Sequence, residues 1–180
     1  MARSHHLPPS AASLTASLRD LGYSLETAIA DLIDNSISAD ATEIQIYCDI
    51  SCSEPALVIA DNGCGMTEGE VIAAMRHGAT DPLKERGPKD LGRFGLGLKT
   101  ASFSQCRRLT VVSAVQGERA GAEWSLAKIE EDDDWFISVL DPDEIEEQPS
   151  IELLGDTGTL VIWRDLDRLF EEETGQKRDE

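Results

Sequence analysis

Asp31 and Asn35 are the first residues of this 180-residue sequence whose types and spacing suit chemistry. They lie four residues apart in AIADLIDNSI (28–37), so on a helix they share one face. A carboxylate in that position can accept a proton, and an amide oxygen is a hard ligand that suits Mg²⁺. The alternative for this pair is a solvated polar helix face.

A second group, DNGCGM (61–66), directly follows an apolar run that is typical of a buried strand. Asp61 is therefore expected at a strand end, where sites on α/β sheets gather, and its carboxylate can accept a hydrogen bond from an exocyclic amine. Gly63 and Gly65 let the backbone pass close to a flat ligand, and Met66 offers an apolar contact to a ring. An ordinary turn is the alternative, because Asp-Asn-Gly is a strong turn signal.

A third group is the glycine series of GRFGLGLKTAS (92–102), which precedes a predicted short helix. Gly92, Gly95 and Gly97 expose backbone N–H groups, and a helix N-terminus adds partial positive charge, so phosphates fit there. Lys99 adds a full positive charge. The series lacks the GxxxxGK[ST] pattern, and no strand leads straight into it as in a dinucleotide-binding fingerprint.

Alternating helices and strands must position these groups. Apolar periodicity and capping residues predict helices over 10–21, 24–38, 67–77 and 96–104. Alternating and continuous apolar runs predict strands over 43–50, 56–61, 109–115, 121–129, 135–140 and 158–166. This order indicates an α/β (α+β) two-layer sandwich, a mixed sheet with helices on one face. The acidic stretch 129–147 is expected to form an edge hairpin and a connecting loop.

Charge and composition restrict the class of protein. The net charge is −19, so direct nucleic-acid binding by this acidic chain is not expected. No apolar run approaches the roughly 20 residues of a membrane span, and the start lacks a secretory signal. With cysteines that show no metal-ligand spacing, a cytoplasmic protein with reduced thiols is expected. Residues 76–108 nevertheless hold eight basic and three acidic residues, which indicates a docking place for a compact polyanion or an ordinary charged loop.

The order of the three groups resembles the GHKL superfamily of ATP-binding domains, named for gyrase, heat-shock chaperone, histidine kinase and MutL. AIADLIDNSI, DNGCGM and GRFGLGLKTAS are similar to its first three sequence boxes. GDTGTLVIWRDL (155–166) is similar to the fourth, in which a Thr on a late strand supports the adenine-binding Asp; Thr159 has that position. The motif sequences are most similar to those of MORC-like and chaperone-like members, and the resemblance runs from about Leu18 to Asp165.

This resemblance implies a Bergerat-type ATP-binding fold with ATP and Mg²⁺ as its ligands. By motif position, Asp61 would read the adenine amino group with Thr159 in support, and Asn35 would ligate Mg²⁺. The other residues of the nucleotide site would be Gly63, Gly65 and Met66 at the adenine, and Gly92, Gly95, Leu96, Gly97 and Lys99 at the phosphates.

The expected activity depends on Asp31. Hydrolytic members of the superfamily carry Glu at that position, and Asp is one methylene shorter, about 1.5 Å less reach. We therefore expect Mg-ATP binding and slow ATP hydrolysis that drives a conformational cycle, with Asp31 as the catalytic residue. The alternatives are a nucleotide-binding switch or scaffold with little hydrolysis, a histidine-kinase-type catalytic domain, which usually has Asn at this position, and an interaction module without nucleotide.

The expected organisation is a single domain over residues 1–180. Residues 1–9 are predicted to be a loose lead-in and residues 78–94 an ATP lid, since RHGATDP (76–82) resembles the start of the lid in MutL and MORC proteins. The polar tail 167–180 is expected to lead to a further domain. ATP-dependent homodimerisation through such additional domains is the partner that the resemblance implies, beside ATP and ADP themselves.

Overall fold

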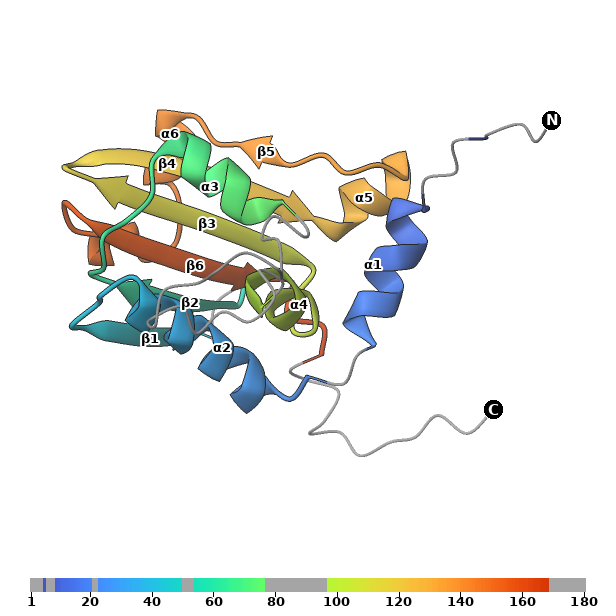
Figure 1. Cartoon of the computed structure of the whole chain (residues 1–180), viewed down its shortest axis with the longest axis horizontal. Coiled ribbons are helices and arrows are strands. Elements are labelled where there is room, and N and C mark those ends of the chain that lie inside the picture. The colour runs from blue at the N-terminus through green and yellow to red at the C-terminus, as the bar shows by residue number, and fades with distance from the viewer. Residues whose placement is uncertain (1–4, 6–8, 21–22, 50–53, 77–96, 169–180) are drawn as a thin grey trace.

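A computed structural model of the chain describes residues 5, 9–20, 23–49, 54–76 and 97–168 (Figure 1). Its helical segments are α1 (Ala11–Arg19), α2 (Leu25–Ser38), α3 (Glu68–Met75), α4 (Gly97–Phe103), α5 (Leu126–Asp132), α6 (Pro142–Glu146) and the 3-10 turn η1 (Ile151–Leu153). Its strands are β1 (Ile44–Asp49), β2 (Ala56–Asp61), β3 (Arg108–Val115), β4 (Glu118–Ser125), β5 (Ser138–Val139) and β6 (Gly158–Arg164). Within these ranges every helix is too short or too polar for a transmembrane span.

Capping side chains explain why the first helices begin where the sequence predicts. Ser10 Oγ accepts the backbone N–H of Ser13 at 3.1 Å at the start of α1. Ser24 Oγ accepts the N–H of Thr27 at 3.3 Å at the start of α2. At the start of α3 the Glu70 carboxylate accepts the N–H of Thr67 at 2.8 Å, as expected of a capping box.

The six strands form one open sheet in the order β1-β2-β6-β3-β4-β5. The two-layer α/β class is confirmed, but the expectation of a mixed sheet is wrong, because each of the strand pairs in the described ranges is antiparallel. The last strand, β6, lies between β2 and β3 and runs antiparallel to both. A motif at the end of β2 and one at the start of β6 thereby become neighbours.

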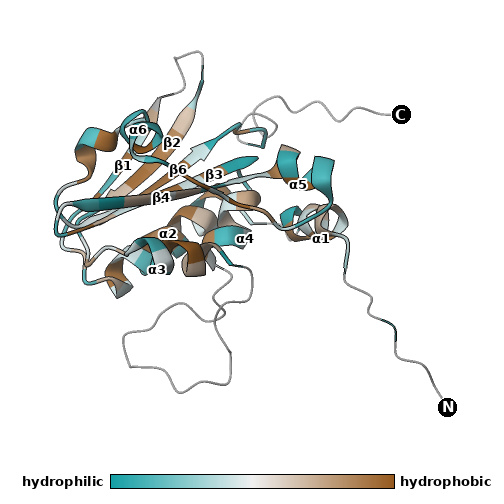
Figure 2. Ribbon diagram, turned by 90° about the horizontal axis from the view of Figure 1, so that it is seen from above, coloured by the Kyte–Doolittle hydropathy of each residue, from teal (hydrophilic) through white to brown (hydrophobic). Residues whose placement is uncertain are grey.

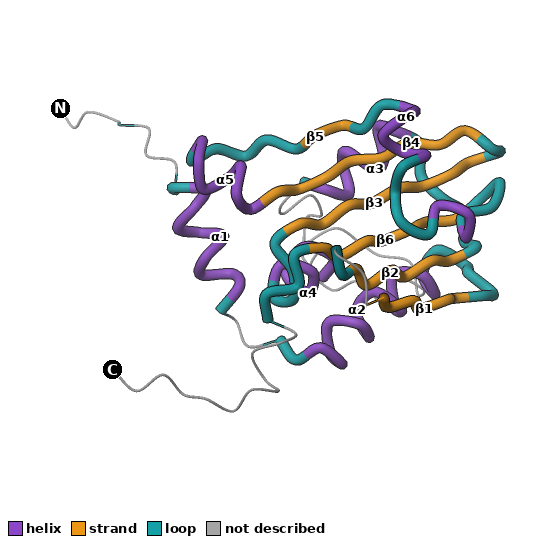
Figure 3. The backbone as a smooth tube through the Cα atoms, turned by 180° about the vertical axis from the view of Figure 1, so that it is seen from behind, coloured by secondary structure: helices purple, strands orange, loops and turns teal. Residues whose placement is uncertain are grey.

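Helices cover both faces of the sheet, although very unequally (Figure 2). The larger core lies between the sheet and α2, α3 and α4, with Leu32, Met75 and Phe103 packed near Trp163. A smaller core on the other face contains Ile145 of α6. Ile145 of α6 lies close to Gly121 of β4. The view from behind shows α6 beside β4 (Figure 3). The expectation of helices on one face only is therefore wrong for this short helix.

The acidic stretch also departs from its expected hairpin. The strand predicted over 121–129 ends at Ser125 and continues as α5, because Leu126 and Ile129 are buried at helical spacing. The strand predicted over 135–140 is reduced to the two residues of β5. Asp141 and Glu144 then cap α6, with Asp141 Oδ1 accepting the N–H of Glu144 at 2.9 Å.

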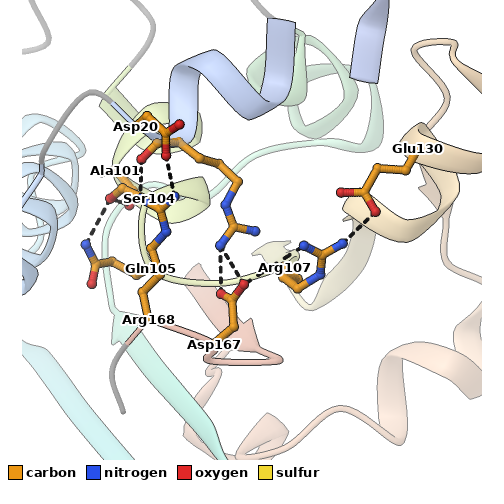
Figure 4. Close-up of polar contacts among 9 residues, drawn as sticks. Asp20, Ala101, Ser104, Gln105, Arg107, Glu130, Asp167 and Arg168 are labelled. Atoms are coloured by element: carbon orange, nitrogen blue, oxygen red, sulfur yellow. Dashed lines mark hydrogen bonds and ion pairs between the residues drawn. The ribbon is translucent and has the colours of Figure 1, made fainter. Parts of the chain in front are cut away.

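Ion pairs fasten the segment after β6 to the N-terminal helix (Figure 4). Arg19 Nη2 lies 2.7 Å from both carboxylate oxygens of Asp167. Arg168 Nη2 donates to Asp20 Oδ1 at 2.6 Å. The first two residues of the expected polar tail are therefore held against α1, whereas the rest of the tail and most of the lead-in 1–9 lie outside the described residues.

Candidate functional site

Three polar side chains form a row across one end of the sheet. Asp61 of β2 pairs with Thr159 of β6, and Thr159 pairs with Ser113 of β3. In its strand, each of the three is separated by two positions from a residue of the larger core, so they lie on the face that α2, α3 and α4 cover. Directly opposed residues bring their Cβ atoms to about 4.5–5.5 Å, so the register alone makes this row a continuous polar surface. We call Asp61, Thr159 and Ser113 the polar row.

Asp61 is held by two hydrogen bonds that orient its carboxylate. Ser36 of α2 donates its hydroxyl to Oδ2 at 2.8 Å, and the backbone N–H of Gly63 donates to Oδ1 at 2.9 Å. None of the basic side chains in the described ranges forms an ion pair with Asp61. The carboxylate is therefore fixed in place and retains acceptor capacity for a ligand.

The loop after Asp61 crosses the end of the sheet at very close range. Gly65 has φ +70°, and a Cβ at this position would lie 1.9 Å from the Ala114 carbonyl oxygen of β3. The next residue, Met66, donates its backbone N–H to Ser113 Oγ at 2.8 Å. The predicted glycine at 65 is thus required for the loop to dock on β3, and this docking places Met66 beside the polar row.

Asp31 lies on the side of α2 that meets α4. A Cβ built on Gly97, the first residue of α4, would lie 3.6 Å from Asp31 Oδ2. Asn35 is exposed one turn further along α2. The first and third sequence groups are therefore adjacent in space, as the sequence requires if they share one ligand.

Tyr23, just before α2, interacts with Asp31 and is a residue that the sequence analysis missed. Burial raises the pKa of the Tyr23 hydroxyl, and a hydrogen bond to the Asp31 carboxylate together with its charge raises this pKa further. A hydroxyl hydrogen-bonded to Asp31 restricts the directions in which the carboxylate can point. Nothing in the sequence marks this residue, because it lies eight positions before Asp31 and outside the helix.

Lys99 is buried, with 2% of its surface exposed, beneath the C-terminal end of α3. Its ammonium group donates to the carbonyl oxygens of Ala74 and Arg76, both at 2.7 Å. Carbonyls at a helix C-terminus attract a cation, but burial still lowers the pKa of Lys99 to about 8. In this structure Lys99 therefore joins α3 to α4, and a contact with phosphate would require it to give up these hydrogen bonds.

Gly92, Gly95, Leu96 and the predicted lid 78–94 lie outside the described residues. Ser36 and Ser113 are further site residues that the sequence analysis missed, because a serine inside an apolar helix or strand carries no signal of its own. The packing of α2 on β2 brings Ser36 to Asp61, and the register of β3 and β6 brings Ser113 to Thr159.

Asp31 and Asn35 are the side chains of this site that could hold a metal ion. Within the described ranges no three His, Cys, Asp or Glu residues cluster as ligands. The carboxylate of Asp31 and the amide oxygen of Asn35 are both hard oxygen donors, and Mg²⁺ bound with a nucleotide takes only one or two protein ligands. These two side chains therefore fit Mg²⁺ that arrives with a phosphate ligand, and they do not form an all-protein metal cage.

Comparisons with known proteins agree with this arrangement. Residues 23–159 match the family described as histidine kinase-, DNA gyrase B-, and HSP90-like ATPase. The chain is 35% identical over 92 residues to ATPase morc-1 of Caenorhabditis elegans, covering 51% of this chain and 10% of that protein. It is 28% identical over 102 residues to DNA mismatch repair protein MutL of Chlamydia abortus, covering 54% and 17%. It is 26% identical over 108 residues to chaperone protein HtpG of Salinispora arenicola, covering 53% and 17%.

The chain spans less than a fifth of the length of each of these relatives. The matched segment nevertheless contains the first three predicted groups and ends at Thr159, in the polar row. The predicted resemblance is confirmed, and the chain belongs to the histidine kinase-, DNA gyrase B- and HSP90-like (GHKL) ATPase family.

Proposed function

We propose that this domain binds ATP with the adenine amino group against Asp61 and Thr159, and hydrolyses it slowly with Asp31 as the general base. The observation that carries the proposal is the oriented Asp61 carboxylate, which has two hydrogen-bond donors from the protein and none of the described cations as a partner. A carboxylate that can still accept hydrogen bonds at the end of a sheet suits the exocyclic amine of a ligand.

The positions of the other predicted site residues support one orientation of the bound nucleotide. The base would lie at the polar row and under Met66, and the phosphates would extend toward the start of α4. Helices α2 and α4 lie side by side over the sheet, so Asp31 would stand beside the terminal phosphate (Figure 1). The glycines and Leu96 just before α4 remain predicted phosphate ligands, and residues 78–94 remain the predicted lid.

In the proposed reaction, the Asp31 carboxylate takes a proton from a water molecule while the oxygen of that water attacks the γ-phosphorus of ATP. The bond between that phosphorus and the bridging oxygen breaks, and ADP leaves. Tyr23 would hold the carboxylate in position through its hydrogen bond. Asn35 is the residue that would hold Mg²⁺, which when bound neutralises charge on the phosphates.

The binding part of the proposal is tested by calorimetric titration with ADP and with ATP plus Mg²⁺. Asp61→Asn keeps the shape of the side chain but removes one acceptor oxygen and its charge, so affinity is expected to fall at least about tenfold. Asp143→Asn on α6, an exposed carboxylate on the other face of the sheet, is the matched control and should bind as the wild type does. Equal affinities in the two variants would remove Asp61 from the site.

The hydrolytic part is tested by phosphate release at saturating ATP. Asp31→Asn is expected to lower the rate at least about 100-fold while nucleotide binding survives, because the amide cannot accept the proton. Asp34→Asn, on the same helix but exposed, is the matched control. Asp31→Glu should raise the rate, because a misplacement of about 1 Å can cost about 100-fold.

Two alternatives give different outcomes in the same assays. If Asp31→Asn and wild type release phosphate at the same rate while both bind ATP, the domain is a nucleotide-dependent switch or scaffold. If the label of γ-labelled ATP appears on protein, the histidine-kinase alternative is correct. We further propose that the nucleotide governs a lid and homodimer cycle, in line with the family, and a nucleotide-dependent change of sedimentation coefficient in a protein that also carries its neighbouring domains would test this.

A further inference from the structure

Ser113 makes more hydrogen bonds than any other member of the polar row. It is completely buried in β3, and its hydroxyl oxygen lies 2.7 Å from the Gly158 carbonyl oxygen, 2.9 Å from Thr159 Oγ1 and 2.8 Å from the backbone nitrogen of Met66. A serine hydroxyl has one hydrogen to donate and two lone pairs with which to accept. Three partners at these distances therefore use all of its capacity.

The identity of each partner determines where every hydrogen lies. The Gly158 carbonyl oxygen can only accept, so Ser113 must donate its single hydrogen to it. The Met66 N–H can only donate, so it uses one lone pair of Ser113. The remaining contact must then run from Thr159 to Ser113, with the Thr159 hydroxyl as the donor. If Ser113 donated to Thr159 instead, two acceptor oxygens would face each other at the 2.7 Å contact with Gly158.

The Thr159 hydroxyl therefore has only lone pairs left for a ligand. Thr159 retains 9% exposure whereas Ser113 has none, so of these two hydroxyls it is Thr159 that a ligand can reach. Its neighbour Asp61 also presents only acceptor oxygens. A water molecule placed between Asp61 and Thr159 would donate both of its hydrogens to them and present its own lone pairs. In either case the ligand must supply a donor.

We propose that Ser113 is a specificity-determining positioning residue: by taking the hydroxyl hydrogen of Thr159, it makes this end of the pocket accept a 6-amino purine and reject a 6-oxo purine. The inference rests on the proposed nucleotide site and adds to it the residue that determines hydrogen-bond direction. Adenine offers an amino group at position 6, whereas hypoxanthine and guanine offer a carbonyl oxygen that would face acceptor oxygens. Such a mismatch leaves buried polar atoms without partners.

The test compares calorimetric affinities for ADP and for inosine diphosphate, which carries the 6-oxo group. In Ser113→Ala the Thr159 hydroxyl is released and can donate to a carbonyl, so the ADP-to-IDP preference is expected to fall about tenfold, the effect of one hydrogen bond. Adding Ser113→Ala to Thr159→Val should change the preference no further, because no hydroxyl hydrogen remains to redirect. Thr110→Ala, which removes a buried hydroxyl on the other face of the same strand, is the matched control and should keep the wild-type preference.

Each outcome decides the proposal. A wild-type preference in Ser113→Ala, with ADP still bound, would overturn the role of Ser113 and leave the proposed ATP site standing. Failure of the folded wild type to bind either nucleotide would overturn the proposed function itself. If Ser113→Ala does not fold, Thr159→Val alone remains decisive: a Thr159 that only accepts predicts weaker ADP binding without weaker IDP binding, and the reverse pattern would refute the assignment.

Discussion

The two ends of the same three strands, β2, β6 and β3, carry side chains of opposite hydrogen-bonding and charge character. At one end the register aligns Asp61, Thr159 and Ser113, and at the other it aligns Ala56, Arg164 and Arg108. The first row faces α2, α3 and α4, and the two arginines lie on the other face, in register with the smaller core. One sheet therefore carries a row of hydroxyl and carboxylate groups at one end and a pair of arginines at the other.

At the arginine end, charge is balanced by the protein itself. Arg164 Nη2 lies 2.7 Å from Glu123 Oε2, and Arg108 lies within 4.0 Å of Glu54, Glu123 and Asp165. Burial lowers the pKa of Arg164, as does the neighbouring Arg108, while Glu123 acts in the opposite direction. A pocket of about 400 Å³ opens here, but both signs of charge line it.

The difference teaches how to tell a ligand site from a structural cluster in this protein. At Asp61 the protein supplies too few donors for its acceptors, whereas at Arg164 acceptors from Thr110, Glu123 and Gln148 surround one guanidinium nitrogen. The charges at the arginine end are paired within the protein, although the Nε atoms of Arg108 and Arg164 are buried without a hydrogen-bond partner among the described residues. At Asp61 the unused acceptor positions remain for solvent or a ligand. Substitutions at the first end should therefore change binding, and substitutions at the second should change stability.

The largest loss of stability and of nucleotide binding is expected from Gly65→Ala, in the loop that covers the polar row. The new Cβ would overlap the Ala114 carbonyl at 1.9 Å, and φ is +70°. Backbone strain and displacement of the loop should together lower the free energy of unfolding by about 3–5 kcal/mol, measured in urea, and abolish nucleotide binding.

Gly69→Ala is the matched control for this substitution. Nothing lies within 4 Å of a Cβ at Gly69, which is in the first turn of α3. Alanine there should stabilise the protein by about 0.4–1 kcal/mol. If Gly65→Ala were equally harmless, the close approach of the loop to β3 would be wrong, and with it the position of Met66.

A smaller effect, confined to stability, is expected at the arginine end. Arg164→Met leaves the Glu123 carboxylate, whose side chain is 19% exposed, without its nearest cation. The free energy of unfolding should fall by about 2–3 kcal/mol, and Glu123→Gln in the same chain should restore at least half of the loss. ADP affinity should stay within about twofold of the wild type, because Arg164 lies at the far end of the sheet. A large loss of affinity at unchanged stability would break the comparison between the two ends.

A pH-dependent effect on stability is expected at Lys99, which is buried against carbonyls and not against a carboxylate. Its pKa is lowered to about 8 in the folded protein and is near 10.5 in the unfolded chain. The folded state therefore loses this proton first, so the stability linked to Lys99 is complete above pH 10.5 and is lost as the pH falls to about 8. Between pH 8 and 10 the free energy of unfolding of the wild type should rise relative to Lys99→Met, by at most about 1.4 kcal/mol per pH unit.

Lys128→Met provides the comparison for Lys99→Met. Lys128 is exposed on α5, so its loss should leave the pH profile of unfolding parallel to that of the wild type. Parallel profiles for Lys99→Met as well would mean that Lys99 reaches solvent or phosphate and is not held beneath α3.

Much of the fold could be predicted because local signals agreed with the tertiary structure. Ser10, Ser24 and the pair Thr67–Glu70 marked helix starts, and the apolar run 56–61 marked a strand. One error came where two patterns overlap, since residues 121–129 were predicted as one strand although Leu126 and Ile129 have helical spacing. Strand direction was also missed, because it depends on which strands pair and not on the pattern within each strand.

The sequence by itself determined the chemistry that this domain can carry: an acid and an amide one turn apart, an Asp after a buried strand, and glycines where the backbone must pass closely. Only the tertiary structure decided which side chains complete that chemistry. Ser36, Ser113 and Tyr23 lie far from the motifs in sequence or carry no pattern, and they reach Asp61, Thr159 and Asp31 through helix packing and antiparallel register. Hydrogen-bond direction is a property of several partners at once, so no single segment of chain contains it.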